Sequence, residues 1–397
     1  MIWDLVIIGG GPVGSFAGYL SANNNIKTLI LEEHDRIGEP IHCLGKLSVH
    51  AFEEFDLPKE TIVNNLKGVY FFSPSGEYLK LKKDSSDSFI LDRILFDKII
   101  AEKAEKSGCS YLFNSKAVGV KHYENYSTLI VEEKGKTKYI NTKVILVAEG
   151  AKRQFLRKIG LKIRPYLVSL QYEISGLNPL DRECVEVYLG STYSQGFFLW
   201  ISPFKNIIKL GVAVNPSYNP KEYLDNFIKK KLKERFEKIY IEKAYGGIIP
   251  IFGPYEEFIS PNILIVGDAA GYNKSTTGGG IYFGFKGAEI AVNQIKKYLE
   301  DYNKAYLSDY PKLTHRSFGK ELTFTKVARK FLNSLSDDDF NLIWSVLKEN
   351  DKIVKTMEKY GDTAYQTSII KIFPNLITSK SFVKLLPLIK TLIKSLL

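Results

Sequence analysis

The sequence predicts a mixed α/β fold in which a βαβ domain carries an inserted antiparallel sheet and is followed by a helical C-terminal region. Three observations carry this prediction. Residues 1–35 contain an apolar strand, a glycine-rich turn, a helical segment and a second apolar strand. Residues 165–260 alternate aromatic and β-branched residues with turns such as Asn178-Pro179, a pattern typical of antiparallel sheets. Beyond Asp301 the pattern is helical with mixed charge.

The βαβ segment contains a glycine motif at the end of its first strand. The strand Asp4–Ile8 leads into Gly9-Gly-Gly11-Pro-Val-Gly14, and the second strand ends at Glu32, 18 residues after Gly14. In a Gly-x-Gly-x-x-Gly turn, the first glycine makes the tight turn, the second lets a pyrophosphate approach the backbone, and the third lets the helix pack on the strand. The helix N-terminus offers free N–H groups to the phosphates. Glu32 is placed to accept ribose hydroxyls, so the segment predicts a dinucleotide site.

The other elements follow from apolar periodicity and turn residues. We expect helices over Arg93–Ser107 and Ile281–Leu299. Strands are expected at Gly68–Leu81, where two strands flank the turn Ser73–Gly76, and at Ser127–Glu133, Lys143–Val147 and Asn262–Val266. The predicted domains are a discontinuous βαβ domain of residues 1–66, 90–160 and 260–300, a sheet domain of residues 67–89 and 161–259, and a helical region of residues 301–397.

Composition bounds the class of protein. The chain has 397 residues, of which 45% are hydrophobic, enough for two or three domains. Its three cysteines (Cys43, Cys109 and Cys184) are too few for a disulfide framework and favour a reducing compartment. The N-terminus lacks a basic n-region, and no run of about 20 uncharged apolar residues occurs. We therefore expect a cytoplasmic protein with no signal peptide and no transmembrane helix.

The net charge of +11 indicates an anionic partner. No nucleic-acid module is recognisable, so nucleic acid is not expected. An anionic membrane surface fits the C-terminus, because residues 380–397 are amphipathic on helical spacing. An equally weighted interpretation is a terminal helix that packs on its own domain. The basic side consists of Lys380, Lys384, Lys390 and Lys394, and the apolar side consists of Leu385, Leu386, Ile389, Leu392, Ile393 and Leu396.

Three further motifs follow the glycine turn in a fixed order. They are Asp92-Arg93-x-x-Phe96-Asp97, the segment Val144–Ala151 with Ala148-Glu149-Gly150, and Asn262–Ala270 with Gly267-Asp268. Together with the βαβ unit they resemble FAD-dependent oxidoreductases of the hydroxybenzoate-hydroxylase type over residues 1–300. The resemblance implies a Rossmann-like FAD-binding domain in which Arg93 contacts the flavin nucleotide and Asp268 holds the ribityl chain. Glu149 departs from the family's usual aspartate, which weakens any inference of a nicotinamide site.

A loop of three glycines, Gly278-Gly279-Gly280, opens the helix that begins at Ile281. Glycines let backbone N–H groups approach a flat ligand closely. A helix N-terminus aimed at the flavin pyrimidine would stabilise the negative charge of the reduced flavin. The alternative is a flexible loop.

A narrower resemblance rests on Ile37-Gly-Glu-Pro-Ile-His-Cys43-Leu-Gly45. It resembles the geranylgeranyl reductase family, whose members carry a cysteine close to the flavin and saturate isoprenoid chains of archaeal lipids and chlorophyll. Archaeal members also carry Pro-x-x-Tyr-x-Trp-x-Phe-Pro on a substrate strand. Here Trp200 and Pro203 match that motif, whereas Gln195, Phe198 and Ser202 depart from it. The departures put the substrate in doubt and leave open another polyprenyl compound, such as a quinone side chain.

This resemblance also implies the cofactor site. The residues at Leu44 and Lys46 are usually glycine in close relatives, so their contacts are expected through the main chain. Flavin contacts are implied at Val13, Glu32, Cys43, Leu44, Lys46, Arg93, Val118, Asp268, Gly280 and Ile281. The motif glycines Gly9, Gly11, Gly14, Gly278 and Gly279 complete the expected site.

Cys43 and the strand around Trp200 allow more than one interpretation. Cys43 is either a structural cysteine or, by the resemblance, a proton donor or polar gate beside the flavin, and we take it as the candidate catalytic residue. A metal site from His34, His42, Cys43 and His50 fits no zinc spacing, so no metal is expected. Phe198 and Trp200 share one strand face. That face lines either a tunnel for a polyprenyl chain or the core of the sheet, and we favour the tunnel.

The favoured hypothesis is a reductase that transfers hydride from reduced FAD to one alkene carbon while a proton reaches the other. The protein then lowers the reaction barrier mainly by orienting the alkene against the flavin and by excluding water. No second Gly-x-Gly-x-x-Gly motif is present, so electrons come from a transient donor, NAD(P)H or a ferredoxin. The alternatives are a flavin monooxygenase or halogenase of the same fold, and a non-catalytic flavoprotein. The favoured hypothesis implies a cytoplasmic protein associated peripherally with membranes.

Overall fold

The computed structural model describes residues 1–40, 43–232, 238–254, 260, 262–372, 374–375 and 383–388. Its strands are β1 (Ile2–Ile8), β2 (Thr28–Leu31), β3 (Lys46–Ser48), β4 (Ile62–Leu66), β5 (Gly68–Phe72), β6 (Tyr78–Lys82), β7 (Ser88–Leu91), β8 (Ser110–Leu112), β9 (Ser115–His122), β10 (Ser127–Glu133), β11 (Lys136–Val147), β12 (Tyr166–Ser175), β13 (Cys184–Tyr188), β14 (Leu199–Phe204), β15 (Ile207–Val214), β16 (Tyr240–Pro250) and β17 (Ile263–Ile265).

The α-helices are α1 (Pro12–Asn23), α2 (Val49–Glu54), α3 (Arg93–Lys106), α4 (Gln154–Lys158), α5 (Pro220–Phe227), α6 (Ile281–Asp301), α7 (Ala305–Thr314), α8 (Lys320–Ser334), α9 (Asp337–Lys348) and α10 (Asp351–Tyr360). Short 3-10 and π-helical turns are η1 (Lys59–Thr61), η2 (Ile228–Leu232), η3 (Gly267–Ala270), η4 (His315–Gly319) and η5 (Gln366–Ile372).

The chain forms two compact units, each made of three segments. Unit 1 consists of Met1–Ile41, Arg93–Pro165 and Pro250–Thr323, and unit 2 of His42–Asp92, Tyr166–Ile249 and Phe324–Leu397. The division into three domains expected from the sequence differs in where it assigns residues 42–66 and 301–397. As a functional division it stays a prediction.

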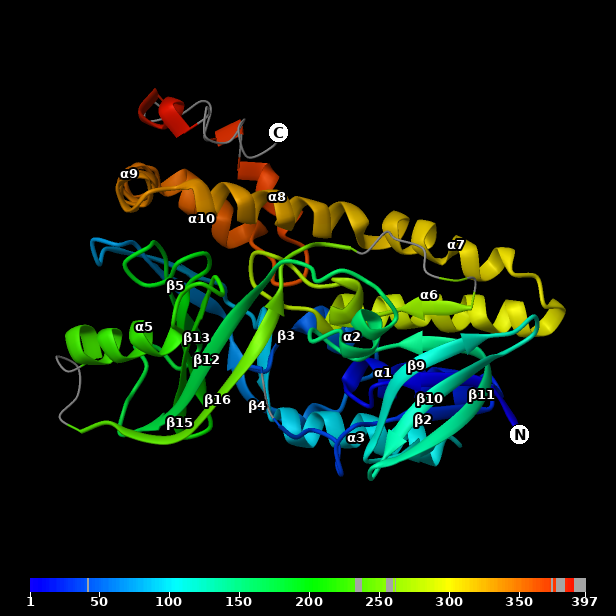
Figure 1. Ribbon diagram of the computed structural model, residues 1–397. Coiled ribbons are helices and arrows are strands. Elements are labelled where there is room, and N and C mark those ends of the chain that lie inside the picture. Colours follow the sequence, from blue (N-terminus) through cyan, green and yellow to red (C-terminus); the bar gives the residue numbers. More distant parts are fainter. Residues whose placement is uncertain are drawn as a thin grey trace. The chain divides into compact units, whose positions relative to one another are not determined.

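Unit 1 is built on a mixed sheet whose strand order is β8-β2-β1-β11-β10-β9, with β17 also paired to β11. β1 runs parallel to β2 and β11, while β9, β10 and the first half of β11 form an antiparallel meander. The buried parts of the parallel strands, such as Leu5–Ile8 and Leu29–Leu31, are continuous apolar runs, as expected for strands buried on both faces. Helix α1 packs against both α3 and α6 (Figure 1). The ring of Phe285 in α6 stacks on Phe16 of α1 at 4.3 Å and lies 6.5 Å from Phe96 of α3.

Unit 2 contains a second sheet of order β16-β12-β15-β14-β13-β5-β6. The pairs β12–β15, β15–β14, β14–β13 and β5–β6 are antiparallel, and the pair β13–β5 is parallel. One face packs apolar side chains of β12 and β15, such as Ile174 and Leu210, against Leu224 and Phe227 of α5. A small antiparallel sheet, β3-β7-β4, belongs to the same unit.

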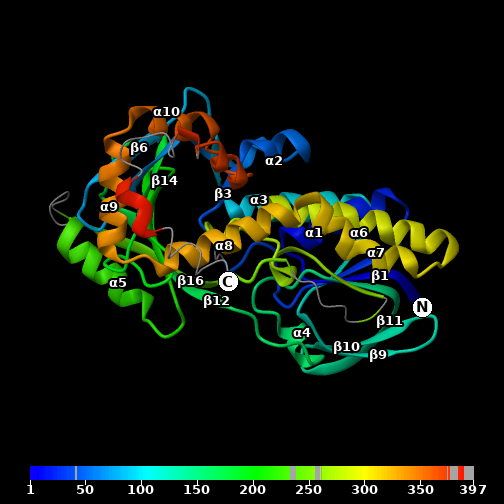
Figure 2. The same cartoon turned by 90° about the horizontal axis from the view of Figure 1, so that it is seen from above.

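The C-terminal helices α9 and α10 pack on strand β6 within unit 2 (Figure 2). The Trp344 indole N–H donates a 3.1 Å hydrogen bond to the Phe71 carbonyl, and the Trp344 ring lies in a cluster with Leu79 and Phe340. Leu388 is buried in this cluster, and Leu385 packs against it. The described part of the amphipathic tail, residues 383–388, therefore packs on its own unit.

The remainder of the amphipathic pattern lies outside the described residues, namely Lys380, Ile389, Lys390, Leu392, Ile393, Lys394 and Leu396. Within residues 383–388, Leu386 is 45% exposed, and Lys384 forms a 2.8 Å ion pair with Glu349. No helix in the described ranges is long and apolar enough to cross a membrane.

Most expected elements are confirmed. The βαβ unit, the two strands around Ser73–Gly76, the helices that begin at Arg93 and Ile281, and the helical C-terminal region are present at or near the predicted residues. Strand β11 is longer than predicted, because residues 136–142 pair with β10 while residues 145–147 pair with β17.

Candidate functional site

The glycine turn between β1 and α1 allows close approach of the backbone on both sides. Gly9 has φ +104°, and a Cβ there would lie 2.5 Å from the Ala148 carbonyl oxygen. A Cβ on Gly14 would lie 2.0 Å from the Gly9 carbonyl oxygen, so the helix can pack on the strand only with glycine here. Apart from its chain neighbours, no described residue has an atom within 4 Å of a Cβ built on Gly11. Gly11 caps α1 without a side-chain hydrogen bond, which leaves the start of the helix open to a phosphate.

Glu32 is held in place at the end of β2. One carboxylate oxygen accepts the Gly10 N–H at 2.8 Å, and the other accepts the His34 N–H at 2.9 Å and lies 2.6 Å from His34 Nδ1. Each carboxylate oxygen has two lone pairs. The buried Glu32 carboxylate is thus fixed in orientation beside the glycine turn and retains capacity for a ribose hydroxyl.

Val13 sits where three elements converge. Its side chain contacts Gly267 of η3 and Gly284 of α6, and a Cβ on Gly284 would lie 2.6 Å from the valine. The Val13 side chain is half-buried at this point, and its implied contact with the flavin stays a prediction.

Asp268 lies in the first turn of η3, against the three-glycine loop. A Cβ on Gly280 would lie 2.4 Å from the Asp268 carboxylate. Burial raises the pKa of Asp268 to about 6, and the positive charge of Arg93 opposes this rise. The Arg93 guanidinium is itself held by Asp97, through bonds of 2.9 and 2.8 Å. These groups belong to α3 and η3 of unit 1, so the structure brings Arg93 and Asp268 into one electrostatic environment.

The glycine loop is closed by its own backbone. The Lys274 N–H donates to the Gly279 carbonyl at 3.1 Å, and the Gly278 N–H donates to the Lys274 carbonyl at 2.7 Å. Asn273 is fully buried, and its amide nitrogen donates to the Pro250 carbonyl at 2.6 Å. The Asn273 amide oxygen accepts no hydrogen bond from the residues that the structure describes. The carboxylate of Asp268 against this glycine loop, together with the uncovered start of helix α1 at Gly11, fits a dinucleotide such as FAD.

Glu149 and Val118 are two further residues of unit 1 that the sequence analysis singled out. The Glu149 carboxylate accepts the N–H groups of Phe155 and Leu156 at 2.6 and 2.9 Å, so it caps helix α4. Burial raises the pKa of Glu149, and those hydrogen bonds oppose the rise. Val118 lies partly buried on β9. Its implied cofactor contact stays a prediction.

In unit 2, residues 43–46 are held by contacts from several elements. The Gly45 N–H points at Cys43 Sγ at 3.4 Å, and Lys209 Nζ lies 3.4 Å from the Leu44 carbonyl oxygen. The Leu44 side chain packs in an apolar cluster with Phe198. Cys43 is partly exposed, whereas Cys109 and Cys184 are buried.

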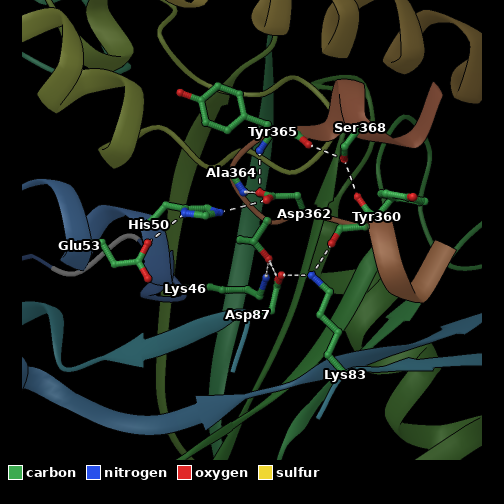
Figure 3. A network of polar contacts seen from close by, with 12 residues as sticks. Lys46, His50, Glu53, Lys83, Asp87, Tyr360, Asp362, Ala364, Tyr365 and Ser368 are labelled. Atoms are coloured by element: carbon green, nitrogen blue, oxygen red, sulfur yellow. Dashed lines mark hydrogen bonds and ion pairs between the residues drawn. The ribbon is translucent and has the colours of Figure 1, made fainter. Parts of the chain in front are cut away.

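The Lys46 side chain enters a polar network with the C-terminal segment (Figure 3). Lys46 Nζ donates to Thr363 Oγ1 at 3.0 Å, and Thr363 also hydrogen-bonds Asp87. His50 of α2 bridges Glu53 and Asp362, each at 3.1 Å. Burial lowers the pKa of Lys46, while Asp87 and Asp362 oppose that shift. The Lys46 side chain is therefore occupied by contacts within unit 2. The expected main-chain contact of Lys46 with the flavin stays a prediction.

Phe198 and Trp200 share a face of unit 2, as expected, with ring centroids 5.8 Å apart. Trp200 is 8% exposed and lies over Gly211, where a Cβ would be 2.3 Å from the indole. Its indole N–H donates to the Gln171 side-chain oxygen at 3.0 Å. Their roles toward a substrate stay a prediction.

Sequence reasoning missed the polar partners of Trp200 on this face. Gln171, Glu173 and Lys209 are all buried. One sequence pattern could have indicated these buried polar residues. Lys209 is a charged residue within the otherwise apolar strand Ile207-Ile-Lys209-Leu-Gly-Val. Among the described residues, no group of three or more His, Cys, Asp or Glu side chains is arranged to hold a metal ion, and His42 is not among those residues.

Replacing Asp268 with asparagine should stabilise the cofactor-free protein at neutral pH. The folded protein binds the Asp268 proton more tightly than the unfolded chain, with a pKa of about 6 against 3.8. Wild-type stability therefore falls as pH rises between these values, by about 1–3 kcal/mol in total. Urea unfolding should show Asp268→Asn more stable than wild type at about pH 7.5 and equal to it at about pH 4. A difference that does not change with pH would contradict this assignment.

Comparisons with known proteins point to one family. The model of the geranylgeranyl reductase catalytic domain matches residues 166–248. A digeranylgeranylglycerophospholipid reductase from Methanocaldococcus jannaschii is 33% identical over 362 residues, 88% of this chain and 91% of the relative. One from Methanococcus vannielii is 28% identical over 88% of this chain and 91% of the relative.

A solved structure, a geranylgeranyl bacteriochlorophyll reductase-like protein from Thermoplasma acidophilum, is similar with a TM-score of 0.83. It shares 25% identity over 98% of this chain and 99% of that one. The predicted mixed α/β flavoprotein fold is confirmed by this likeness and by the relatives. The chain belongs to the geranylgeranyl reductase family of FAD-dependent oxidoreductases.

Proposed function

We propose that this protein is an FAD-dependent reductase that saturates carbon–carbon double bonds of geranylgeranyl chains in archaeal-type membrane lipids or their precursors. The observation that carries the proposal is the 33% identity to a digeranylgeranylglycerophospholipid reductase along 91% of that relative. The site in unit 1 supports the proposal. The start of helix α1 at Gly11 is uncovered and the Glu32 carboxylate is fixed in orientation, and both features suit a dinucleotide.

The residues that would hold FAD are those of the two glycine loops and their acidic neighbours. The α1 N-terminus would take the pyrophosphate and Glu32 a ribose. Asp268, which lies against the three-glycine loop, is the polar group that would face the ribityl chain. Reduced FAD, when bound, supplies the hydride for alkene reduction.

The protein's own tasks are orientation, exclusion of water and delivery of one proton. Phe198 and Trp200 offer an apolar face suited to an isoprenoid chain. Cys43 Sγ is the proposed source of the proton for the second alkene carbon. Unactivated alkenes resist attack, so a chain held in one orientation in an apolar site is a condition of turnover.

The electron donor belongs to the proposal as well. We take it to be NAD(P)H or a ferredoxin. The net charge of +11 favours encounter with an acidic redox protein, because complementary charge raises association rates. A reductase of another polyprenyl compound is the second candidate, since Gln195, Phe198 and Ser202 depart from the archaeal substrate-strand motif.

The activity is tested without a natural donor. Purified protein reduced with dithionite under anaerobic conditions should reoxidise when an unsaturated archaeal ether lipid is added. Product mass should rise by about two units per double bond, since each reduction adds one hydride and one proton. Substrate-stimulated oxygen uptake with a hydroxylated product would instead establish a monooxygenase. Reduced flavin with no mass change in any prenyl lipid would contradict a reductase of this class.

Cys43→Ser should retain FAD and lose turnover, because a serine hydroxyl is a much weaker acid than a thiol. General acid catalysis contributes about 100-fold or more, so kcat for alkene reduction should fall by at least that factor with KM little changed. Cys184→Ala, which removes a buried cysteine of the same unit, is the matched control. An equal loss in both variants would point to packing rather than proton transfer.

A truncation after Leu388 tests peripheral membrane binding. It keeps the packed residues Leu385 and Leu388 and removes Lys390 and Lys394. Each lysine near an anionic surface contributes about 1 kcal/mol, so binding to vesicles rich in anionic lipid should weaken roughly 30-fold. FAD content should not change. Equal vesicle binding by both proteins in a sedimentation assay would rule out residues 389–397 as the membrane contact.

A further inference from the structure

One face of the large sheet of unit 2 carries a connected row of polar side chains. Strand register places Glu173 opposite Lys209 and Gln171 opposite Gly211, while Trp200 also lies opposite Gly211. Side chains at alternate positions share a face, so these residues lie together on the side of the sheet away from α5. Both charged members are buried: Lys209 is 1% and Glu173 is 6% exposed.

Three hydrogen bonds and one ion pair connect these side chains. The Trp200 indole N–H donates to Gln171 Oε1 at 3.0 Å, and Gln171 Nε2 donates to the Tyr245 hydroxyl at 2.9 Å. The Tyr245 O–H donates to Glu173 Oε1 at 3.0 Å. Lys209 Nζ lies 4.0 Å from the same carboxylate oxygen and 3.8 Å from the centre of the Phe204 ring.

The far end of this row reaches the segment that holds the candidate catalytic thiol. Lys209 Nζ donates to the Leu44 carbonyl at 3.4 Å. Leu44 directly follows Cys43, whose sulfur accepts the Gly45 N–H at 3.4 Å. The row therefore connects the Trp200 side chain to the backbone of residues 43–45 through groups that belong to a single unit of the fold.

A buried ion pair of this kind is a poor source of stability. Both charges lose their hydration, so apolar side chains of similar size often serve stability as well or better. Loss of the 3.4 Å contact to the Leu44 carbonyl would nevertheless deprive a buried ammonium of one acceptor, which costs free energy. The arrangement suits a group that fixes the position of a backbone carbonyl, because a lysine held by Glu173 and by the Phe204 ring has little freedom to move.

We propose that Lys209 is a positioning residue, which together with Glu173 fixes residues 43–45 and so sets the position of the Cys43 thiol relative to Trp200. Only the turnover readout of this inference rests on the proposed reductase function. The position of Cys43 can be measured without any substrate, because the partly exposed Cys43 differs from the buried Cys109 and Cys184.

The test measures alkylation of the three cysteines in the FAD-bound protein by mass spectrometry after iodoacetamide treatment. Lys209→Met removes the ammonium and keeps most of the side-chain volume. The double variant Lys209→Met with Glu173→Gln also removes the charge that the single change leaves unpaired. The matched control is Lys205→Met, which removes an exposed lysine from the same hairpin together with its 2.7 Å ion pair to Asp92.

In Lys209→Met, Cys43 should be alkylated roughly tenfold faster, since a lost hydrogen bond to a charged group shifts a local opening by about that factor. Cys109 and Cys184 should stay protected, and FAD content should not change. Alkene reduction should lose about 10- to 100-fold in kcat, with a smaller change in KM. The double variant should be more stable to heat than Lys209→Met. Its Cys43 should remain as reactive, and its kcat as low, as in Lys209→Met. Lys205→Met should match wild type in every readout.

Two results would overturn the proposal. One is wild-type alkylation of Cys43 in both Lys209 variants. The other is faster alkylation of all three cysteines together, reversed in the double variant, which would make Lys209 merely structural. If wild type reduces no alkene but protection of Cys43 still depends on Lys209, the positioning role stands and the proposed activity fails.

Discussion

The contact between Gly14 and the Gly9 carbonyl oxygen is the constraint on which unit 1 depends. A Cβ on Gly14 would lie only 2.0 Å from that oxygen, so α1 can leave β1 at this angle only if no side chain intervenes. The same turn brings the Gly10 N–H to the Glu32 carboxylate. The open helix start, the fixed acid and the packed Val13 all follow from this one close approach, which explains why a dinucleotide cradle needs so few side chains.

Buried charge is handled differently in the two units. In unit 1, Asp268 lies against a glycine loop, and burial raises the pKa of its carboxyl group to about 6. In unit 2, Lys209 and Glu173 are both buried, but each has the other and further hydrogen-bonding groups. The first arrangement suits a ligand that supplies the missing hydrogen-bond donors. The second is complete within the protein and suits a role in holding geometry.

The sequence predicted what is encoded locally. The βαβ unit and the helices after Arg93 and Ile281 follow from periodicity, glycines and caps within a few residues. The polar row could not be predicted, because Gln171, Glu173, Lys209 and Tyr245 meet only through strand pairing, with 74 positions between Gln171 and Tyr245. The contact from Lys46 to Thr363 spans 317 positions and no local pattern indicates it. Glu149 stood out as an unusual acid, but its cap on α4 depends on a turn that the motif does not specify.

The alternation of side chains along β12 and β15 links folding to the candidate chemistry. Ile174 and Leu210 enter the apolar core with α5, and their neighbours Glu173 and Lys209 therefore face the opposite side. A slip of β15 by one residue would turn Lys209 into the apolar α5 core and away from Glu173, at a cost of several kcal/mol for an unpaired buried charge. The packing that selects the register thus also determines where the Lys209 ammonium lies. That ammonium contacts the carbonyl of Leu44, the residue next to Cys43.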